Sequence, residues 1–98
     1  MAIPNEVKIG GKKYTVSVTE YLISGTRDTS AEIDFRASAI RVTPQEEQKM
    51  KTDFIHELVH GILDHLGYDE HDEQLVDGIA NTLFAINVDN PGLFEKLR

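Results

Sequence analysis

The sequence predicts an α+β fold: a small antiparallel N-terminal sheet of three to four short strands, then two longer helices and a short C-terminal helix. Two patterns predict it. Apolar residues alternate with polar ones up to residue 42, which is the period of half-buried strands. From Thr43 onward they recur every three or four positions, which is the period of amphipathic helices. With 98 residues, of which 40% are hydrophobic, one domain spanning residues 1–98 with a single modest core is expected.

The expected strands lie in two pairs. The run EVKIGGKKYTVSVTE, residues 6–20, contains Gly10-Gly11 between two strand-like segments and predicts a hairpin with a two-residue turn. Three residues of its second strand would share one face: Tyr14, Val16 and Val18. Residues 22–30 are polar and contain glycine, so they are expected to form a loop. The run AEIDFRASAIRV, residues 31–42, predicts two more short strands around residues 36–38.

The first helix is expected to begin at Thr43-Pro44-Gln45-Glu46. Thr43 is a favoured N-cap, proline is favoured at the first helical position, and a glutamate follows three residues after the cap. Good helix formers continue to about Leu66, and Gly67 is well placed to end the helix. Its expected apolar side consists of Phe54, Ile55, Leu58, Val59, Ile62 and Leu66.

A short acidic link, residues 68–72, precedes the second helix, which is expected from about Asp72 to Val88. The apolar positions of that helix include Val76, Ala80, Leu83 and Phe84. Asn90-Pro91 then predicts the cap and first turn of a last short helix that ends at Leu97.

The first helix carries the pattern His56-Glu57-Leu58-Val59-His60. Residues i and i+4 lie one turn apart on the same face, so both imidazoles can point at one spot and supply two nitrogen ligands of a tetrahedral Zn²⁺. Glu57 lies about 100° round the helix from His56, where it can reach a metal-bound water without being a ligand. H-E-x-x-H on a helix is a metallopeptidase arrangement.

A catalytic zinc site usually has three protein ligands and a water, so one more ligand is needed. The acidic and histidine residues that follow supply the candidates: Asp64, His65, Glu70, His71, Asp72, Glu73 and Asp77. His65 lies about 180° round the helix from His56 and is rejected. Glu73 and Asp77 share a face at the edge of an apolar stripe, where carboxylates need a partner or a metal. They are therefore the preferred pair, and His71 remains an alternative.

The composition excludes several classes of function. The net charge of −7 argues against a nucleic-acid partner and against an anionic membrane surface, because both require a basic face. The chain has no cysteine, so disulfides, thiolate zinc sites and a cysteine nucleophile are excluded. The N-terminus lacks an apolar signal-peptide core and no apolar run reaches membrane-spanning length, so a cytoplasmic location is expected.

Together, these features resemble the gluzincin class of zinc metallopeptidases: a strand-rich N-terminal half, an H-E-x-x-H helix, and E-x-x-x-D on the next helix. The small size is similar to that of the minigluzincins. The run HELVHGILDHLGYDEHDEQLVDGIANTLFAI, followed by DNP, is similar to the ImmA/IrrE-like peptidase domains of phages and mobile elements. The architectural resemblance covers residues 33–94, and its specific motifs lie within residues 56–77.

The resemblance implies a zincin-like domain with one zinc ion held by His56, His60 and Glu73. It also implies that Glu57 acts as general base and acid and that Asp77 holds a ligand histidine. The implied reaction is hydrolysis of peptide bonds in a protein or peptide substrate, which the ImmA-like resemblance suggests is a regulatory protein.

The residue that contacts the substrate or the transition state is left open between Tyr68, His71 and Tyr21. An extended substrate is expected to pair with the strand nearest the active helix, and residues 39–42 are predicted to form that strand. Two other interpretations are open. One is a catalytically silent zinc-binding interaction module. The other is a structural protein in which His56 and His60 are ordinary helix residues.

Overall fold

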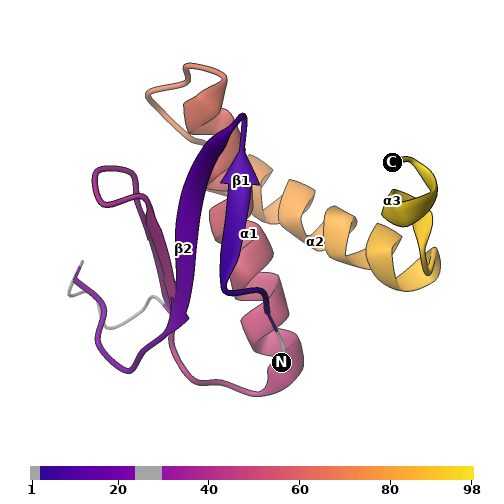
Figure 1. The fold of residues 1–98 in the computed structure, drawn as a ribbon, viewed down its shortest axis with the longest axis horizontal. Coiled ribbons are helices and arrows are strands. Elements are labelled where there is room, and N and C mark those ends of the chain that lie inside the picture. Colours follow the sequence, from indigo (N-terminus) through magenta and orange to yellow (C-terminus); the bar gives the residue numbers. More distant parts are fainter. Residues whose placement is uncertain (1–2, 24–29) are drawn as a thin grey trace.

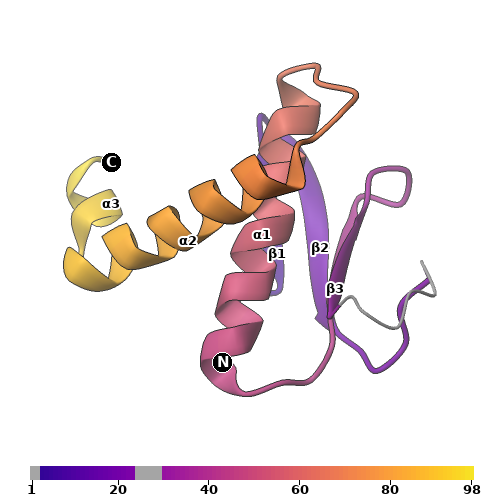
Figure 2. The ribbon, with the colours of Figure 1, turned by 180° about the vertical axis from the view of Figure 1, so that it is seen from behind.

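The computed structural model describes residues 3–23 and 30–98. Its elements are β1 (Glu6–Ile9), β2 (Lys12–Val18), β3 (Ala31–Asp34), β4 (Ala39–Val42), α1 (Glu47–His65), α2 (Glu73–Asp89) and α3 (Leu93–Lys96). The fold is α+β, with a four-stranded sheet and three helices, as the change of period at residue 43 predicts. Helix α1 packs along one face of the sheet (Figure 1). Helix α2 crosses α1 and projects away from the sheet, with α3 at its far end (Figure 2).

The sheet is mixed, and its strand order is β1-β2-β4-β3. The pairs β1–β2 and β3–β4 are antiparallel, but β2 and β4 run parallel, with Val16 opposite Ile40. The expected fully antiparallel sheet is therefore wrong at this central pair. Alternation fixes which side chains face the core, but it does not fix the direction of a neighbouring strand. Residues 24–29 of the expected loop lie outside the described residues.

The position of β4 excludes one expectation about substrate binding. Strand β4 is hydrogen-bonded to β2 on one side and to β3 on the other. Its backbone donors and acceptors are used within the sheet, so it cannot accept an additional strand. The expectation that residues 39–42 pair with a substrate is therefore wrong. Strand β3 is an edge of the sheet and packs against α1.

The β1–β2 hairpin forms as predicted. Ile9 pairs with Lys12, and the two residues between them, Gly10 and Gly11, have φ of 58° and 88°. Positive φ at both central positions is the requirement of a type I′ turn, which glycine meets without strain. Gly10 also lies against His65 at the end of α1, where a Cβ would collide with the imidazole ring. His65 thus packs beside the hairpin turn, away from the other histidines.

Helix α1 begins later than predicted. Its N-cap is Glu46, whose Oε1 accepts the backbone N–H of Lys49 at 2.9 Å. The backbone N–H and the hydroxyl of Thr43 both donate to the carbonyl of Ser30, each at 2.8 Å. Thr43 therefore extends the sheet, and its expected role as N-cap is wrong. The predicted end is confirmed: α1 ends at His65, and Gly67 follows with φ of 92°.

Helix α2 begins at Glu73 because Asp72 caps it, with its Oδ1 accepting the N–H groups of Gln74 and Leu75. This agrees with the prediction to within a residue. The expected start of the last helix at Asn90-Pro91 is wrong. Asn90 donates its side-chain N–H to the carbonyl of Ile86 and so ends α2, and α3 begins after Gly92.

Two apolar clusters hold α1 in place. The larger lies between the sheet and α1 and contains Tyr14, Val16, Ile40, Val42 and Phe54 among others. The smaller lies between α1 and α2 and contains Val59, Val76 and Ala80. Helix α1 is therefore fixed from both sides, which orients the face that carries its histidines. Within residues 3–23 and 30–98, no helix has the length and apolar character needed to cross a bilayer.

Candidate metal centre

Helix α1 places His56 and His60 one turn apart, with their ring centroids separated by 4.9 Å. Both side chains are largely buried, with 24% and 14% of their surface exposed. The neighbouring residues explain their direction. Phe54 packs towards the sheet and Val59 packs towards α2, so the histidines occupy the strip of α1 between these two contacts.

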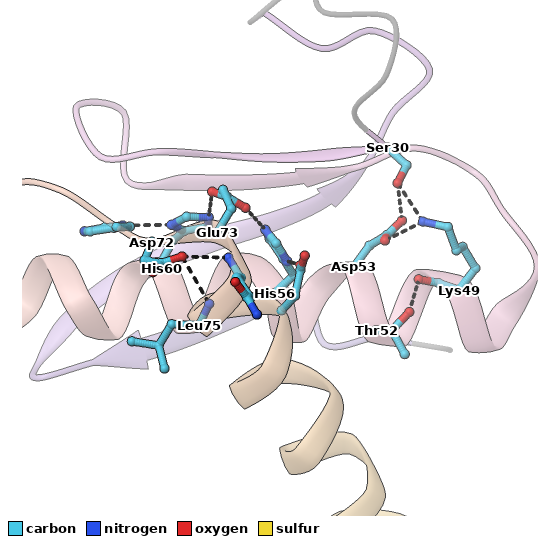
Figure 3. A network of polar contacts seen from close by, with 12 residues as sticks. Ser30, Lys49, Thr52, Asp53, His56, His60, Asp72, Glu73 and Leu75 are labelled. Atoms are coloured by element: carbon cyan, nitrogen blue, oxygen red, sulfur yellow. Dashed lines mark hydrogen bonds and ion pairs between the residues drawn. The ribbon is translucent and has the colours of Figure 1, made fainter.

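The carboxylate of Glu73 lies between the two histidines (Figure 3). Its Oε1 is 2.9 Å from Nε2 of His60, and its Oε2 is 3.2 Å from Nε2 of His56. The side chain comes from the first turn of α2. Packing of Val76 against Val59 brings that turn over α1. The approach of Glu73 to both histidines, which the resemblance implies, is therefore present.

The three side chains could hold one metal ion, because a ligand atom from each lies within 4.8 Å of the others. Two imidazole nitrogens and one carboxylate oxygen suit a borderline divalent metal such as zinc.

Asp77 orients the first histidine. Its Oδ1 lies 2.8 Å from Nδ1 of His56, one helical turn after Glu73. A carboxylate accepts hydrogen bonds, so Nδ1 of His56 carries the proton and Nε2 of a neutral ring is left with a lone pair. That lone pair faces a carboxylate oxygen of Glu73, so a positive species belongs between them, either a proton or a metal ion.

Glu73 and Asp77 lie at the edge of the apolar stripe of α2, as predicted, and Val76 and Ala80 of that stripe are buried. The two carboxylate side chains are 65% and 61% exposed. Burial therefore does not explain why carboxylates occupy these positions. The short contacts of the two carboxylates with His56 and His60 explain it.

Glu57 is buried beside the candidate metal-binding group, with 8% of its surface exposed. It lines a cleft of ≈ 280 Å³ together with Ser30, Ala31, Asp53, His56, Glu73 and Asp77. Burial, followed by repulsion from the nearby carboxylates of Glu73, Asp53 and Glu32, raises the pKa of Glu57 to about 7. The sequence predicts a carboxyl beside the ligands, and Glu57 occupies that position.

Burial lowers the pKa of His60 below its ordinary value of 6.5. The carboxylate of Glu73 opposes this shift, and the neighbouring imidazoles of His56 and His71 add to it. A lowered pKa favours the neutral ring, and only a neutral ring offers the lone pair that binds a metal.

The candidates for substrate contact lie elsewhere. The cleft is lined by Ser30, Ala31, Asp53, His56, Glu57, Glu73 and Asp77, which does not include Tyr68, His71 or Tyr21. Tyr21 is 82% exposed and Tyr68 is 57% exposed. His71 contacts the far side of the His60 ring, where the two Nδ1 atoms are 2.7 Å apart. The role of all three residues in contacting a substrate stays a prediction.

One network at the cleft was not predicted from the sequence. Ser30 donates to Oδ2 of Asp53 at 2.6 Å, and Nζ of Lys49 lies 2.6 Å from Oδ1 of the same carboxylate (Figure 3). The ammonium also donates to Oγ of Ser30 at 2.9 Å. The network ties the start of β3 to α1 at the cleft. The spacing of Asp53 and Glu57, four residues apart on one helix face, is the signal that could have indicated Asp53.

Comparisons with known protein families, with curated proteins and with solved structures find no significant match to this chain. The site is therefore defined by its own geometry. Two imidazoles and a carboxylate from consecutive helices converge, and a buried glutamate lies next to them.

Proposed function

We propose that this protein is a zinc-dependent metallopeptidase of the gluzincin type. In this proposal His56, His60 and Glu73 hold one zinc ion, and Glu57 acts as general base and then as general acid. The observation that carries the proposal is the approach of both Nε2 atoms of the H-E-x-x-H histidines to one carboxylate of the following helix. The position of Glu57 in the adjoining cleft supports it.

Each residue of the site has a distinct task in peptide hydrolysis. A bound zinc ion would supply the Lewis acid that polarises a carbonyl and acidifies water. Glu57 would take the proton from the attacking water and give it to the leaving amine as the C–N bond breaks. Asp77 holds the His56 ring through Nδ1, which keeps Nε2 directed at the centre of the site.

Strand β3 is the element best placed to bind a peptide. It is an edge of the sheet, and its first residue, Ala31, lines the cleft together with Ser30. An extended peptide could add to this edge by backbone hydrogen bonds, which would place a scissile bond over the cleft. The contact of Ser30 with Asp53 and Lys49 keeps this end of the strand on α1.

The proposal is tested with Glu57→Gln, which keeps the shape of the side chain and removes its basicity. Zinc content and cleavage of a broad peptide library are measured for the native protein and the variant. We expect equal zinc content and a loss of cleavage of about 10²–10⁴-fold in the variant. Glu47→Gln, an exposed position of the same helix, serves as the matched control and should cleave like the native protein.

Two results would contradict the proposal. A native protein that takes up no zinc has no metal centre of this kind. Zinc uptake by native protein and Glu57→Gln, together with cleavage that is equal in both or absent in both, would exclude the peptidase. Zinc uptake without any cleavage would instead favour a zinc-binding interaction module.

A further inference from the structure

We propose that His71 is the positioning residue for His60. It accepts a hydrogen bond from Nδ1–H of His60 and so holds the His60 ring with the Nε2 lone pair directed at the metal centre. This inference rests on the proposed function only in taking His60 as a metal ligand. It assigns to His71 a role outside the cleft, in place of a contact with substrate.

The His71 ring is held on three sides. Its Nδ1 lies 2.7 Å from Nδ1 of His60, and the two rings stack with centroids 5.0 Å apart at an interplanar angle of 24°. Its Nε2 lies 3.0 Å from the carbonyl oxygen of Tyr68. The ring of Phe35, in the turn between β3 and β4, lies nearly perpendicular to the His71 ring, with the two centroids 6.4 Å apart. His71 therefore has a defined position although it belongs to the link between α1 and α2.

The carbonyl of Tyr68 decides where the protons lie. A carbonyl oxygen only accepts hydrogen bonds, so Nε2 of His71 carries a proton and donates it. A neutral imidazole has one N–H, so Nδ1 of His71 is an acceptor. The close partner of that acceptor, Nδ1 of His60, must then be the donor. The Nε2 of His60 is thereby left with its lone pair towards Glu73, 2.9 Å away.

The two histidines of α1 are thus oriented by different partners in the same way. Asp77 accepts from Nδ1 of His56, and His71 accepts from Nδ1 of His60. Both Nε2 atoms face the carboxylate of Glu73. Loss of the acceptor at residue 71 would let the His60 ring turn or change tautomer. The lone pair of Nε2 would then be available to bind the metal for only part of the time.

The experiment measures zinc affinity by competition with a chromophoric chelator. His71→Phe keeps an aromatic ring for stacking but removes the acceptor, and we expect zinc affinity to fall about 10–100-fold. His71→Asn restores an acceptor oxygen and should recover part of the loss. His65→Gln, which alters an exposed histidine of the same helix beside the hairpin turn, should bind zinc like the native protein.

A second measurement does not depend on a variant that folds. Long-range ¹H–¹⁵N spectra of the zinc-loaded native protein report which nitrogen of each histidine carries a proton. We expect His60 to be protonated on Nδ1 and His71 on Nε2. Native-like zinc affinity in His71→Phe, or a proton on Nδ1 of His71, would overturn the inference.

The two proposals fail in different ways. Zinc affinity and the histidine tautomers can be measured without peptide cleavage. If the protein cleaves no peptide but the variants show the expected zinc affinities, the role of His71 stands and the peptidase proposal fails. The converse result is cleavage that depends on metal and is abolished in Glu57→Gln while His71→Phe binds zinc like the native protein. In that case the peptidase proposal stands and the role of His71 is excluded.

Discussion

Asp34 shows how one carboxylate can organise a turn. Its Oδ1 accepts the backbone N–H of Arg36 at 3.1 Å and that of Ala37 at 2.9 Å, and its Oδ2 lies 3.4 Å from the guanidinium of Arg41. The hydrogen bond from Ala37 is the main reason why the pKa of Asp34 lies below its ordinary value of 3.8. Burial opposes this shift, and Arg41 adds to it. The ionised form is therefore favoured by the folded state.

We expect Asp34→Asn to be less stable than the native protein at neutral pH. Because folding lowers the pKa, the contribution of Asp34 to stability is present above 3.8 and is lost as the pH falls through the folded value. The difference in urea midpoint between native and variant should therefore shrink as the solution is acidified below 3.8. Asp69→Asn, in the exposed link, makes the same change of net charge and controls for it. A difference independent of pH would contradict this explanation.

At the scale of single residues, periodicity predicts part of the centre. Positions i and i+4 on α1 bring His56 and His60 together whatever the rest of the fold does. The approach of Glu73 additionally needs α2 to cross α1 near its own first turn, and the E-x-x-x-D pattern indicates which face it presents. The contact of His71 with His60 depends on the path of a non-periodic link, and sequence periods carry no information about that path.

At the scale of elements, α1 is packed tightly against the sheet at Gly61. A Cβ at this position would press on Cδ1 of Ile9 and of Ile33, whereas a Cβ at Gly78 of α2 meets nothing within 4 Å. Both glycines lie inside helices, so alanine would improve the helix propensity of both by about 1 kcal/mol. Only at Gly61 does the close approach of the strands oppose that gain.

We therefore expect opposite signs for two otherwise identical substitutions. Gly61→Ala should lower the free energy of unfolding, because overpacking costs about 1–3 kcal/mol. Gly78→Ala should raise it by up to about 1 kcal/mol. Urea denaturation of both variants measures this difference. A Gly61→Ala protein at least as stable as the native one would show that the sheet yields to the added methyl group.

The elements also show where local patterns fail. Thr43 has the sequence of a helix cap, but its position is set by hydrogen bonds to the start of β3. The carbonyl of Ser30 accepts hydrogen bonds from both the N–H and the hydroxyl of Thr43, and Glu46 caps the helix instead. The parallel pairing of β2 with β4 likewise depends on how two hairpins meet, which alternation within each strand does not encode.

At the scale of the whole molecule, the candidate centre joins two helices that also pack through a small apolar cluster. His56 and His60 come from α1 and Glu73 from α2, while Val59, Val76 and Ala80 supply the buried contact between them. A metal ion that binds the folded state would therefore connect the sheet layer, through α1, to the projecting α2.

We expect zinc to raise the melting midpoint of the native protein and a chelator to reverse the increase. A free zinc concentration of about 100 Kd adds about 2.7 kcal/mol to stability, which corresponds to roughly 10–20 °C for a chain of this size. Thermal melts followed by circular dichroism provide the measurement. Glu73→Gln should show a smaller increase because it removes the carboxylate ligand. An unchanged midpoint in native protein would support a purely structural role for the histidines.

The start of α2 at Glu73 has a consequence for how the centre assembles. Glu73, the proposed third ligand, belongs to a helical turn that is held by the side chain of Asp72, and helix ends are the parts of a helix that open most readily. Each time that turn frays, the carboxylate leaves the histidines. The first turn of α2 therefore becomes ordered in the same step that brings the Glu73 carboxylate to the histidines. Amide exchange at Gln74 and Leu75 would report how long the three side chains stay together.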